Sequence, residues 1–276
     1  KKHANAQREH RRQRVRSGAM TVGFVGYTNA GKSSLFQHLS GKSVLVEDQL
    51  FSTLETTVGR MEKSPRILLA DTIGFIDNIP NATLTAFKAT IAEAIDADLT
   101  LVLLDTSDSL DEIRRKLDTT RREVLERQEN EPDLLEDTNQ PHVVLTKIDK
   151  VSPEKREAVA ALVGEEGFPA PVAVSSHTGE GVDALQLFIR EQLFGASVSV
   201  TVLPPTSTSP DASERIVSEV YDRGMVDDDH RETDGTTRLD VWMTQACQAQ
   251  LKARWADRID IKSVSYTHLT LPTSPK

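Results

Sequence analysis

The chain has 276 residues, of which 38% are hydrophobic and 27% are charged, and its formal net charge is −9. This length allows one α/β domain of ordinary size and a smaller companion domain. No apolar run reaches 18 residues, which argues against a membrane-spanning helix. The single cysteine, Cys247, excludes an internal disulfide and a cysteine-rich metal site.

The charge is unevenly distributed along the chain. Residues 1–16 hold seven Lys or Arg and one acidic residue, so the remaining residues carry about −15. Because an acidic body repels nucleic-acid phosphates, we expect any RNA contact to fall to residues 1–16; the alternative is a solvated, charged helix. No apolar stretch follows this arm, so we do not expect residues 1–20 to be a secretory signal. We therefore expect a cytoplasmic protein without membrane contact, and a monomer.

Compact apolar runs alternate with amphipathic stretches over the first two thirds of the chain. Strands are predicted at 21–25, 66–70, 99–105, 142–146 and 171–175, and helices at 32–41, 82–95, 108–128, 152–163 and 181–193. This alternation is typical of an α/β fold with a mostly parallel central sheet flanked by helices. The polar, acidic segment 128–140 is predicted to be a surface insertion.

A smaller α+β unit is predicted after the last of these helices. Its expected elements are an alternating strand at 197–203, a helix at 211–223, a polar turn at 227–236, a strand at 239–243 and a helix at 244–258. None of them carries a motif with a chemical mechanism. The expected domains are therefore a basic helical remnant at 1–18, a nucleotide-binding domain at 19–195, an α+β domain at 196–262 and a non-native tail at 263–276.

The segment GYTNAGKS, from Gly26 to Ser33, matches the phosphate-binding loop pattern and lies between a predicted strand and a predicted helix. In such a loop, backbone amides cradle phosphates, Lys32 reaches the β and γ oxygens, and the Ser33 hydroxyl binds Mg²⁺. The alternative is a flexible glycine turn that opens a helix. The residues predicted to bind nucleotide here are Gly26, Asn29, Ala30, Gly31, Lys32, Ser33 and Ser34.

The segment DTIG directly follows the predicted strand 66–70. At this place Asp71 can hold Mg²⁺ through a water molecule, and the Gly74 amide can contact the γ phosphate. Taken alone, Asp-x-x-Gly is a common turn, but its position after the phosphate loop favours the functional interpretation. A Thr-rich segment lies between the two motifs, and Thr53 is the first candidate there for a hydroxyl ligand of Mg²⁺, with Thr56 and Thr57 as competitors.

The segment TKID follows the predicted strand 142–146. A carboxylate at Asp149 can accept hydrogen bonds from guanine N1 and N2, whereas adenine presents an acceptor at N1, so this motif favours GTP over ATP. The Lys147 stem can cover the base, and the Ser176 amide in the segment SSHTGEG can meet guanine O6. A lone TKID can equally be a solvated strand end. The residues predicted to bind the base are Thr146, Lys147, Asp149, Ser175, Ser176 and His177.

With these motifs identified, the chain resembles the HflX family of ribosome-associated P-loop GTPases, of the translation-factor class. The segments GYTNAGKSSLF, LFSTLETT and DTIGFI carry the resemblance, which extends over about residues 1–262. It implies hydrolysis of GTP to GDP and phosphate with Mg²⁺, and catalytic roles for Lys32, Thr53 and Gly74. It also implies binding to the large ribosomal subunit, with rRNA contact through residues 1–16. Family members carry an amino-terminal domain, which we expect to be missing from this chain.

Two positions bear on the rate of hydrolysis. Phe75 stands where many GTPases place a glutamine that orients the attacking water, so we expect slow hydrolysis without a partner. Asn29 resembles the loop asparagine with which related GTPases bind K⁺ beside the phosphates; its alternative role is local hydrogen bonding. The competing interpretation of the chain is a nucleotide-dependent binding module with negligible hydrolysis of its own. Ser176 replaces the usual alanine, which changes little because the amide makes the contact.

Overall fold

The computed structural model describes residues 19–41, 57–61, 64–71, 97–130, 140–206 and 211–264. The chain divides into two compact units, residues 1–193 and residues 194–276. The predicted helix at 82–95 and the basic arm lie outside the described residues.

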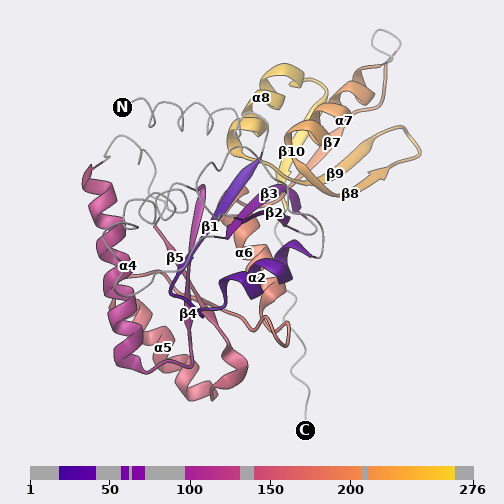
Figure 1. Cartoon of the computed structure of the whole chain (residues 1–276). Helices are drawn as coiled ribbons and strands as arrows, with labels where there is room; N and C mark the ends of the chain where they lie inside the picture. Colours follow the sequence, from indigo (N-terminus) through magenta and orange to yellow (C-terminus); the bar gives the residue numbers. More distant parts are fainter. Residues whose placement is uncertain are drawn as a thin grey trace. The chain divides into compact units, whose positions relative to one another are not determined.

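The first unit is built on a six-stranded sheet in the order β2-β3-β1-β4-β5-β6 (Figure 1). Only the pair β2–β3 is antiparallel, and the other four pairs are parallel. The predicted mostly parallel sheet is therefore confirmed. All seven residues of β1 are buried, which explains the continuous apolar run in the sequence. The strands are β1 (Met20–Gly26), β2 (Thr57–Met61), β3 (Ser64–Asp71), β4 (Leu99–Asp105), β5 (His142–Thr146) and β6 (Val172–Ala173).

Helices cover both faces of this sheet. Figure 1 shows α4 and α5 on one side and α2 and α6 on the other. On the first side, Ile113 and Leu117 of α4 join Val159 of α5 in one buried cluster with residues of β4 and β5. The bounds are α2 (Lys32–Ser40), α4 (Leu110–Asn130), the 3₁₀ turn η2 (Ile148–Lys150), α5 (Pro153–Glu165) and α6 (Val182–Phe194). The helices predicted between the strands are thus present wherever the structure describes them.

The edge strand β2 was not predicted, because its segment resembles a polar loop. Its pairing with β3 places Thr57 opposite Asp71. A side chain at Gly59 would come within 2.8 Å of the Phe36 ring of α2, so glycine lets the helix pack closely here. At the opposite edge, the strand predicted at 171–175 shortens to the two residues of β6.

The second unit has the element order β7-α7-β8-β9-α8-β10 and an antiparallel sheet in the order β10-β7-β9-β8. This is a β-α-β-β-α-β arrangement of the ferredoxin-like type. Both helices contribute to one buried cluster with the inward-facing residues of the strands, including Ile216 of α7 and Leu251 of α8. The bounds are β7 (Val198–Val202), α7 (Ala212–Arg223), β8 (Met225–Arg231), β9 (Thr237–Trp242), α8 (Gln245–Trp255) and β10 (Ile259–Ser263).

Two expectations for this unit were wrong. The polar turn predicted at 227–236 begins as strand β8, whose residues from Asp227 onward are polar because β8 is an edge strand with an exposed surface. The helix predicted to reach residue 258 ends at Trp255, and β10 follows it. This strand escaped prediction because only two of its residues, Ile259 and Ile261, are buried.

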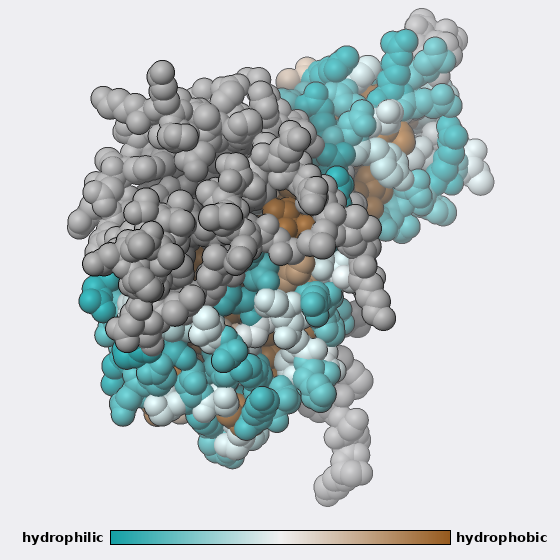
Figure 2. Space-filling model, in the orientation of Figure 1, coloured by the Kyte–Doolittle hydropathy of each residue, from teal (hydrophilic) through white to brown (hydrophobic). Residues whose placement is uncertain are grey.

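The described surface is mainly hydrophilic, with hydrophobic residues showing between polar ones in the view of Figure 2. Among the residues that the structure describes, the exposed large hydrophobic side chains are Leu110, Leu203 and Tyr221. No helix in the described ranges has the length and apolarity that crossing a membrane requires.

Candidate nucleotide-binding site

The carboxyl ends of the parallel strands bring the predicted motifs to one edge of the first sheet. In the sheet register Asp71 lies opposite Phe24, near the end of β1, and Thr146 lies opposite Asp105. The β1–β4 register pairs Gly26 with Leu103, two residues before β4 ends. Ligands of open α/β sheets bind outside the carboxyl ends of the strands, and the candidate site lies there.

The loop between β1 and α2 has a backbone that few residues can adopt. Gly26 has φ 154°, and a side chain there would lie 2.6 Å from the Leu103 carbonyl oxygen. Asn29 (φ 63°) and Gly31 (φ 89°) are both in the left-handed region, and Gly31 caps the amino terminus of α2. These positive φ angles turn the chain around the amino terminus of a helix, where backbone N–H groups favour anions.

Lys32 is folded against this loop. Its Nζ atom donates hydrogen bonds to the carbonyl oxygens of Gly26 (3.1 Å) and Tyr27 (2.9 Å), and the side chain is buried. Burial lowers the pKa of Lys32 below its usual value, and the nearby Asp71 carboxylate opposes that shift. The ammonium group is therefore held where the loop backbone surrounds it.

Asp71, the last residue of β3, lies beside Lys32 and Ser33. Burial raises the pKa of Asp71 above its usual value, while hydrogen bonding to the Ser33 hydroxyl and the charge of Lys32 oppose the shift. Its Oδ1 atom is buried and has no hydrogen-bond partner among the residues that the structure describes. A buried carboxylate oxygen without a partner, next to a hydroxyl, offers the hard oxygen ligands that Mg²⁺ prefers. The residues present therefore fit a magnesium ion.

Thr146 ties the end of β5 to the phosphate-binding loop. Its buried hydroxyl donates to the carbonyl oxygen of Ala30 (2.7 Å) and to that of Leu104 (3.0 Å). The Thr106 hydroxyl in turn donates to the carbonyl oxygen of Thr146 (2.7 Å). The predicted base-binding strand and the predicted phosphate loop are thus directly linked, although they are more than 100 residues apart in sequence.

Asp149 is oriented by the segment that follows β6. The Ser175 hydroxyl donates to Asp149 Oδ1 (2.6 Å), and the same hydroxyl oxygen accepts from the backbone N–H groups of His177 and Thr178 (both 3.2 Å). This hydrogen bond to Ser175 is the main reason why the pKa of Asp149 lies below its usual value. The carboxylate is exposed, oriented and ionised, as the reading of a guanine edge requires.

The turns that carry Asp149 and Ser175 are joined by Arg156. Its guanidinium donates to the Ile148 carbonyl oxygen through Nε (3.1 Å) and Nη2 (2.7 Å) and pairs with Glu180 at 2.7 Å. Gly181 closes the second turn with φ 77°, and a side chain there would lie 2.0 Å from the Ala173 carbonyl oxygen. The backbone path at Gly181 therefore requires glycine.

Most of the residues predicted for the site lie at this edge. Ser34 is exposed in the first turn of α2, and Ser176 is half-buried between Ser175 and His177. Thr57 begins β2 opposite Asp71. The predicted residues that lie outside the described part of the chain are Thr53, Thr56, Gly74 and Phe75. The residues that the structure brings to the edge are Gly26, Asn29, Ala30, Gly31, Lys32, Ser33, Asp71, Thr146, Lys147, Asp149, Ser175 and His177.

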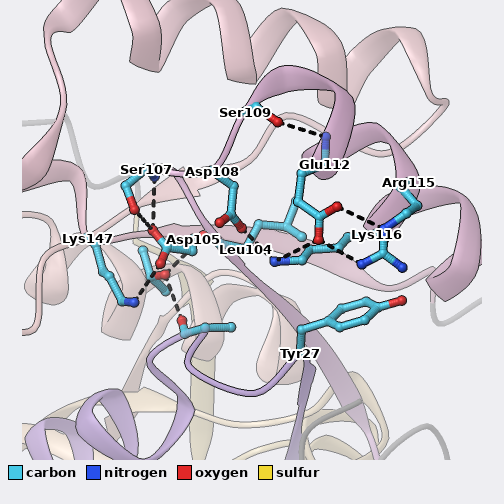
Figure 3. Close-up of polar contacts among 12 residues, drawn as sticks. Tyr27, Leu104, Asp105, Ser107, Asp108, Ser109, Glu112, Arg115, Lys116 and Lys147 are labelled. Atoms are coloured by element: carbon cyan, nitrogen blue, oxygen red, sulfur yellow. Dashed lines mark hydrogen bonds and ion pairs between the residues drawn. The ribbon is translucent and has the colours of Figure 1, made fainter. Parts of the chain in front are cut away.

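Sequence reasoning missed Asp105. Figure 3 shows Lys147 reaching Asp105, with 2.5 Å between Lys147 Nζ and Asp105 Oδ2. Burial tends to raise the pKa of Asp105, but hydrogen bonds from Lys147 and Ser107 outweigh it and bring the pKa below its usual value. Asp105 ends a buried strand, as Asp71 does, and that signal in the sequence LTLVLLD points to it.

Sequence reasoning also missed the surroundings of Tyr27, the second residue of the loop. Arg115 and Lys116 of α4 lie over its ring, each 5.2 Å from the centroid (Figure 3). Lys116 also pairs with Asp108 at 2.6 Å. The aromatic side chain is buried, and these cations fasten the loop to α4.

The glycine loop with its lysine, the magnesium-fitting carboxylate and the oriented aspartate after β5 define the class of P-loop GTPases. Comparison with known proteins agrees. A family described as "50S ribosome-binding GTPase" matches residues 21–147, and a family described as "HflX C-terminal domain" matches residues 160–262. The chain belongs to the HflX family of GTPases.

Individual relatives agree with this assignment. The chain is 36% identical over 225 residues to the GTPase HflX of Gluconacetobacter diazotrophicus, covering 80% of this chain and 46% of that protein. It is 34% identical over 242 residues to the GTPase HflX of Escherichia coli, covering 86% and 52%. The chain thus spans about half the length of the curated relatives it matches. A GTP-binding protein from Sulfolobus solfataricus, solved with GDP, is similar with a TM-score of 0.49 and 25% identity, covering 63% of this chain and 52% of that one.

Proposed function

We propose that this chain binds guanine nucleotide with Mg²⁺ and hydrolyses GTP to GDP and phosphate. One observation carries the proposal: the hydroxyl of Thr146 joins the loop that holds Lys32 to the strand end that carries Asp149. A triphosphate and its purine can therefore be bound along a single sheet edge. The proposed nucleotide-binding domain spans residues 19–195, and residues 196–262 form the proposed carboxyl-terminal α+β domain.

The phosphate end of the site has distinct roles for its residues. The backbone amides of the loop from Gly26 to Ser34 cradle the phosphates, and Lys32 exchanges its contacts with loop carbonyls for phosphate oxygens. Ser33 and Asp71 hold Mg²⁺, which neutralises phosphate charge when it is bound. Thr53 and Gly74, proposed on sequence alone, complete the contacts to Mg²⁺ and the γ phosphate.

The base end reads guanine. Asp149 accepts hydrogen bonds from guanine N1 and N2, and its orientation by Ser175 supports that role. Lys147 covers the base with its stem, and the Ser176 amide meets guanine O6. An adenine would set its N1 acceptor against the Asp149 carboxylate, which excludes ATP.

The rate and the partner follow from the resemblance. The Phe75 side chain cannot form a hydrogen bond with an attacking water molecule. Hydrolysis is therefore slow until a partner or a cation supplies the missing stabilisation. Asn29, whose backbone is left-handed, is the residue proposed to contact K⁺ beside the phosphates. The proposed partner is the large ribosomal subunit, in the cytoplasm, with residues 1–16 as the arm that contacts rRNA. The competing function is a nucleotide-dependent binding module without useful hydrolysis, which Phe75 favours.

Nucleotide competition on the purified chain tests the binding proposal. We expect GTP and GDP, but not ATP, to displace a fluorescent GDP analogue, and Lys32→Ala and Asp149→Asn to weaken binding. Asp118→Asn is the matched control, because Asp118 pairs with Arg121 on the exposed side of α4. Unchanged GDP affinity in Asp149→Asn would show that the base assignment is wrong.

Single-turnover hydrolysis separates the two functions. We expect a slow rate that rises when large ribosomal subunits are added, and a faster rate in KCl than in NaCl at equal ionic strength. A negligible rate with and without subunits leaves only the binding module. Equal rates in the two salts remove the role of K⁺.

A further inference from the structure

The ion pair between Asp105 and Lys147 is closed and partly shielded from water. Only 13% of the Asp105 side chain and 26% of the Lys147 side chain are exposed. The ammonium group of Lys147 is thereby committed to a carboxylate at the end of β4, on the strand next to its own. Exposed ion pairs contribute little because water screens them, but a pair this far buried keeps a defined geometry.

The turn after β4 holds Asp105 in the orientation that this pair needs. Asp105 Oδ1 accepts hydrogen bonds from the backbone N–H of Ser107 (2.9 Å) and from its hydroxyl (2.6 Å). Lys155 of α5 donates to the Ser107 carbonyl oxygen (3.0 Å), which fastens the same turn. Asp105 Oδ2 is left to Lys147, so each carboxylate oxygen has its own partner.

The backbone conformation at Lys147 also restricts the orientation of its side chain. Lys147 has φ 56°, a left-handed conformation that is uncommon for a residue with a side chain. The Lys150 N–H donates to the Lys147 carbonyl oxygen (3.0 Å), which closes the turn that carries Asp149. With the backbone fixed at one end and the ammonium fixed at the other, the methylene stem between them has little freedom left.

We propose that Asp105 is a positioning residue for guanine nucleotide, which acts by holding the Lys147 ammonium so that the Lys147 stem lies ready to cover the purine. The inference rests on the proposed nucleotide binding of this site. It makes Lys147 an apolar cover rather than a source of charge, because its charge is already paired with Asp105. Since Asp105 lies at the base end of the site, its substitution should weaken the binding of GDP and of GTP equally.

The test measures dissociation constants of fluorescent GDP and of a non-hydrolysable GTP analogue for the whole chain. Asp105→Asn should weaken both by about fivefold, the equivalent of about 1 kcal/mol. Lys147→Met keeps an apolar stem but loses the ammonium group, so it should weaken both by about the same factor as Asp105→Asn, whereas Lys147→Ala also loses the stem and should weaken both by more than about tenfold. Asp105→Asn added to Lys147→Met should then have no further effect, because the ammonium that Asp105 holds is gone.

Glu166→Gln is the control. Glu166 pairs with Arg114 of α4 at 3.1 Å, and 15% of the Glu166 side chain is exposed, so it is a partly buried carboxylate in an ion pair, as Asp105 is. In the described part of the chain it contacts no residue proposed for the site, so its substitution should leave both dissociation constants unchanged. A thermal melt of each variant verifies that it is folded.

Several results would overturn the inference. One is an equal loss in Asp105→Asn and Glu166→Gln. Another is a loss from Asp105→Asn that persists in the Lys147→Met background, since Asp105 would then act through its turn. If Asp105→Asn does not fold, Lys147→Met tests the inference instead. A loss of nucleotide affinity as large as that of Lys147→Ala would contradict the apolar role of the Lys147 stem. Failure of the unsubstituted chain to bind GDP would instead refute the proposed function, whereas normal binding with an unaffected Asp105→Asn refutes only this inference.

Discussion

Replacing Thr146 by valine removes one hydroxyl and nearly preserves the shape of the side chain. That hydroxyl donates to the carbonyl oxygens of Ala30 and Leu104, at 2.7 and 3.0 Å. It is therefore the direct link between the phosphate-binding loop and the ends of β4 and β5. Only 2% of Thr146 is exposed, so water cannot replace the lost donor.

The expected cost follows from the two acceptors. A typical hydrogen bond contributes about 1 kcal/mol to stability, and a buried polar group left without a partner costs about 1–3 kcal/mol. We expect Thr146→Val to lower the free energy of unfolding by about 2 kcal/mol. Nucleotide phosphates present acceptors and no donor, so they cannot satisfy the Ala30 carbonyl oxygen. The loss should therefore persist at saturating GDP.

Urea unfolding followed by far-UV circular dichroism measures this change. Both tryptophans, Trp242 and Trp255, lie in the second unit, so tryptophan fluorescence does not report on the site directly. The midpoint should fall while the slope with urea stays constant, because the surface exposed on unfolding is unchanged.

Thr120→Val is the control for this measurement. Thr120 is also buried, but its hydroxyl donates to the Lys116 carbonyl oxygen one turn earlier in the same helix (2.9 Å). Such a bond adds little to a helix, so we expect a loss below about 0.5 kcal/mol. Equal losses in the two variants, or a loss in Thr146→Val that GDP abolishes, would refute the reasoning.

Three further changes probe the site. Gly26→Ala places a methyl group 2.6 Å from the Leu103 carbonyl oxygen, so GDP affinity measured by fluorescence should fall by at least about tenfold. Gly181→Ala brings a methyl group within 2.0 Å of the Ala173 carbonyl oxygen, and calorimetry should show a lower melting temperature together with weaker GDP binding. Burial raises the pKa of Asp71 above its unfolded value, so its contribution to stability is lost as pH rises through the folded pKa. Without Mg²⁺ at pH 7, Asp71→Asn should therefore melt at a higher temperature than the unsubstituted chain, and Mg²⁺ should no longer tighten GDP binding; a lower melting temperature contradicts this.

The sequence was sufficient for the features that depend on neighbouring residues. The strand β1, the glycine loop and the helix α2 are adjacent in the chain, so the motif from Gly26 to Ser33 and its apolar neighbours predicted this succession. The same holds for the ends of β3 and β5. There, an apolar run followed by a polar motif predicted that Asp71 and Thr146 lie at strand ends. The carboxyl ends of parallel strands lie at one edge of a sheet, so motifs that directly follow such strands converge there.

The tertiary structure decided what depends on which strands are neighbours. Asp105 holds Lys147 because β4 lies next to β5, and Tyr27 meets Arg115 and Lys116 because α4 passes over the loop. The sequence of β8 shows no alternation of apolar and polar residues, so it does not predict a strand. Its backbone pairing with β9 makes it one. Such contacts join residues that are far apart in the chain. Their energies depend on distances in the folded structure, which the local sequence does not predict.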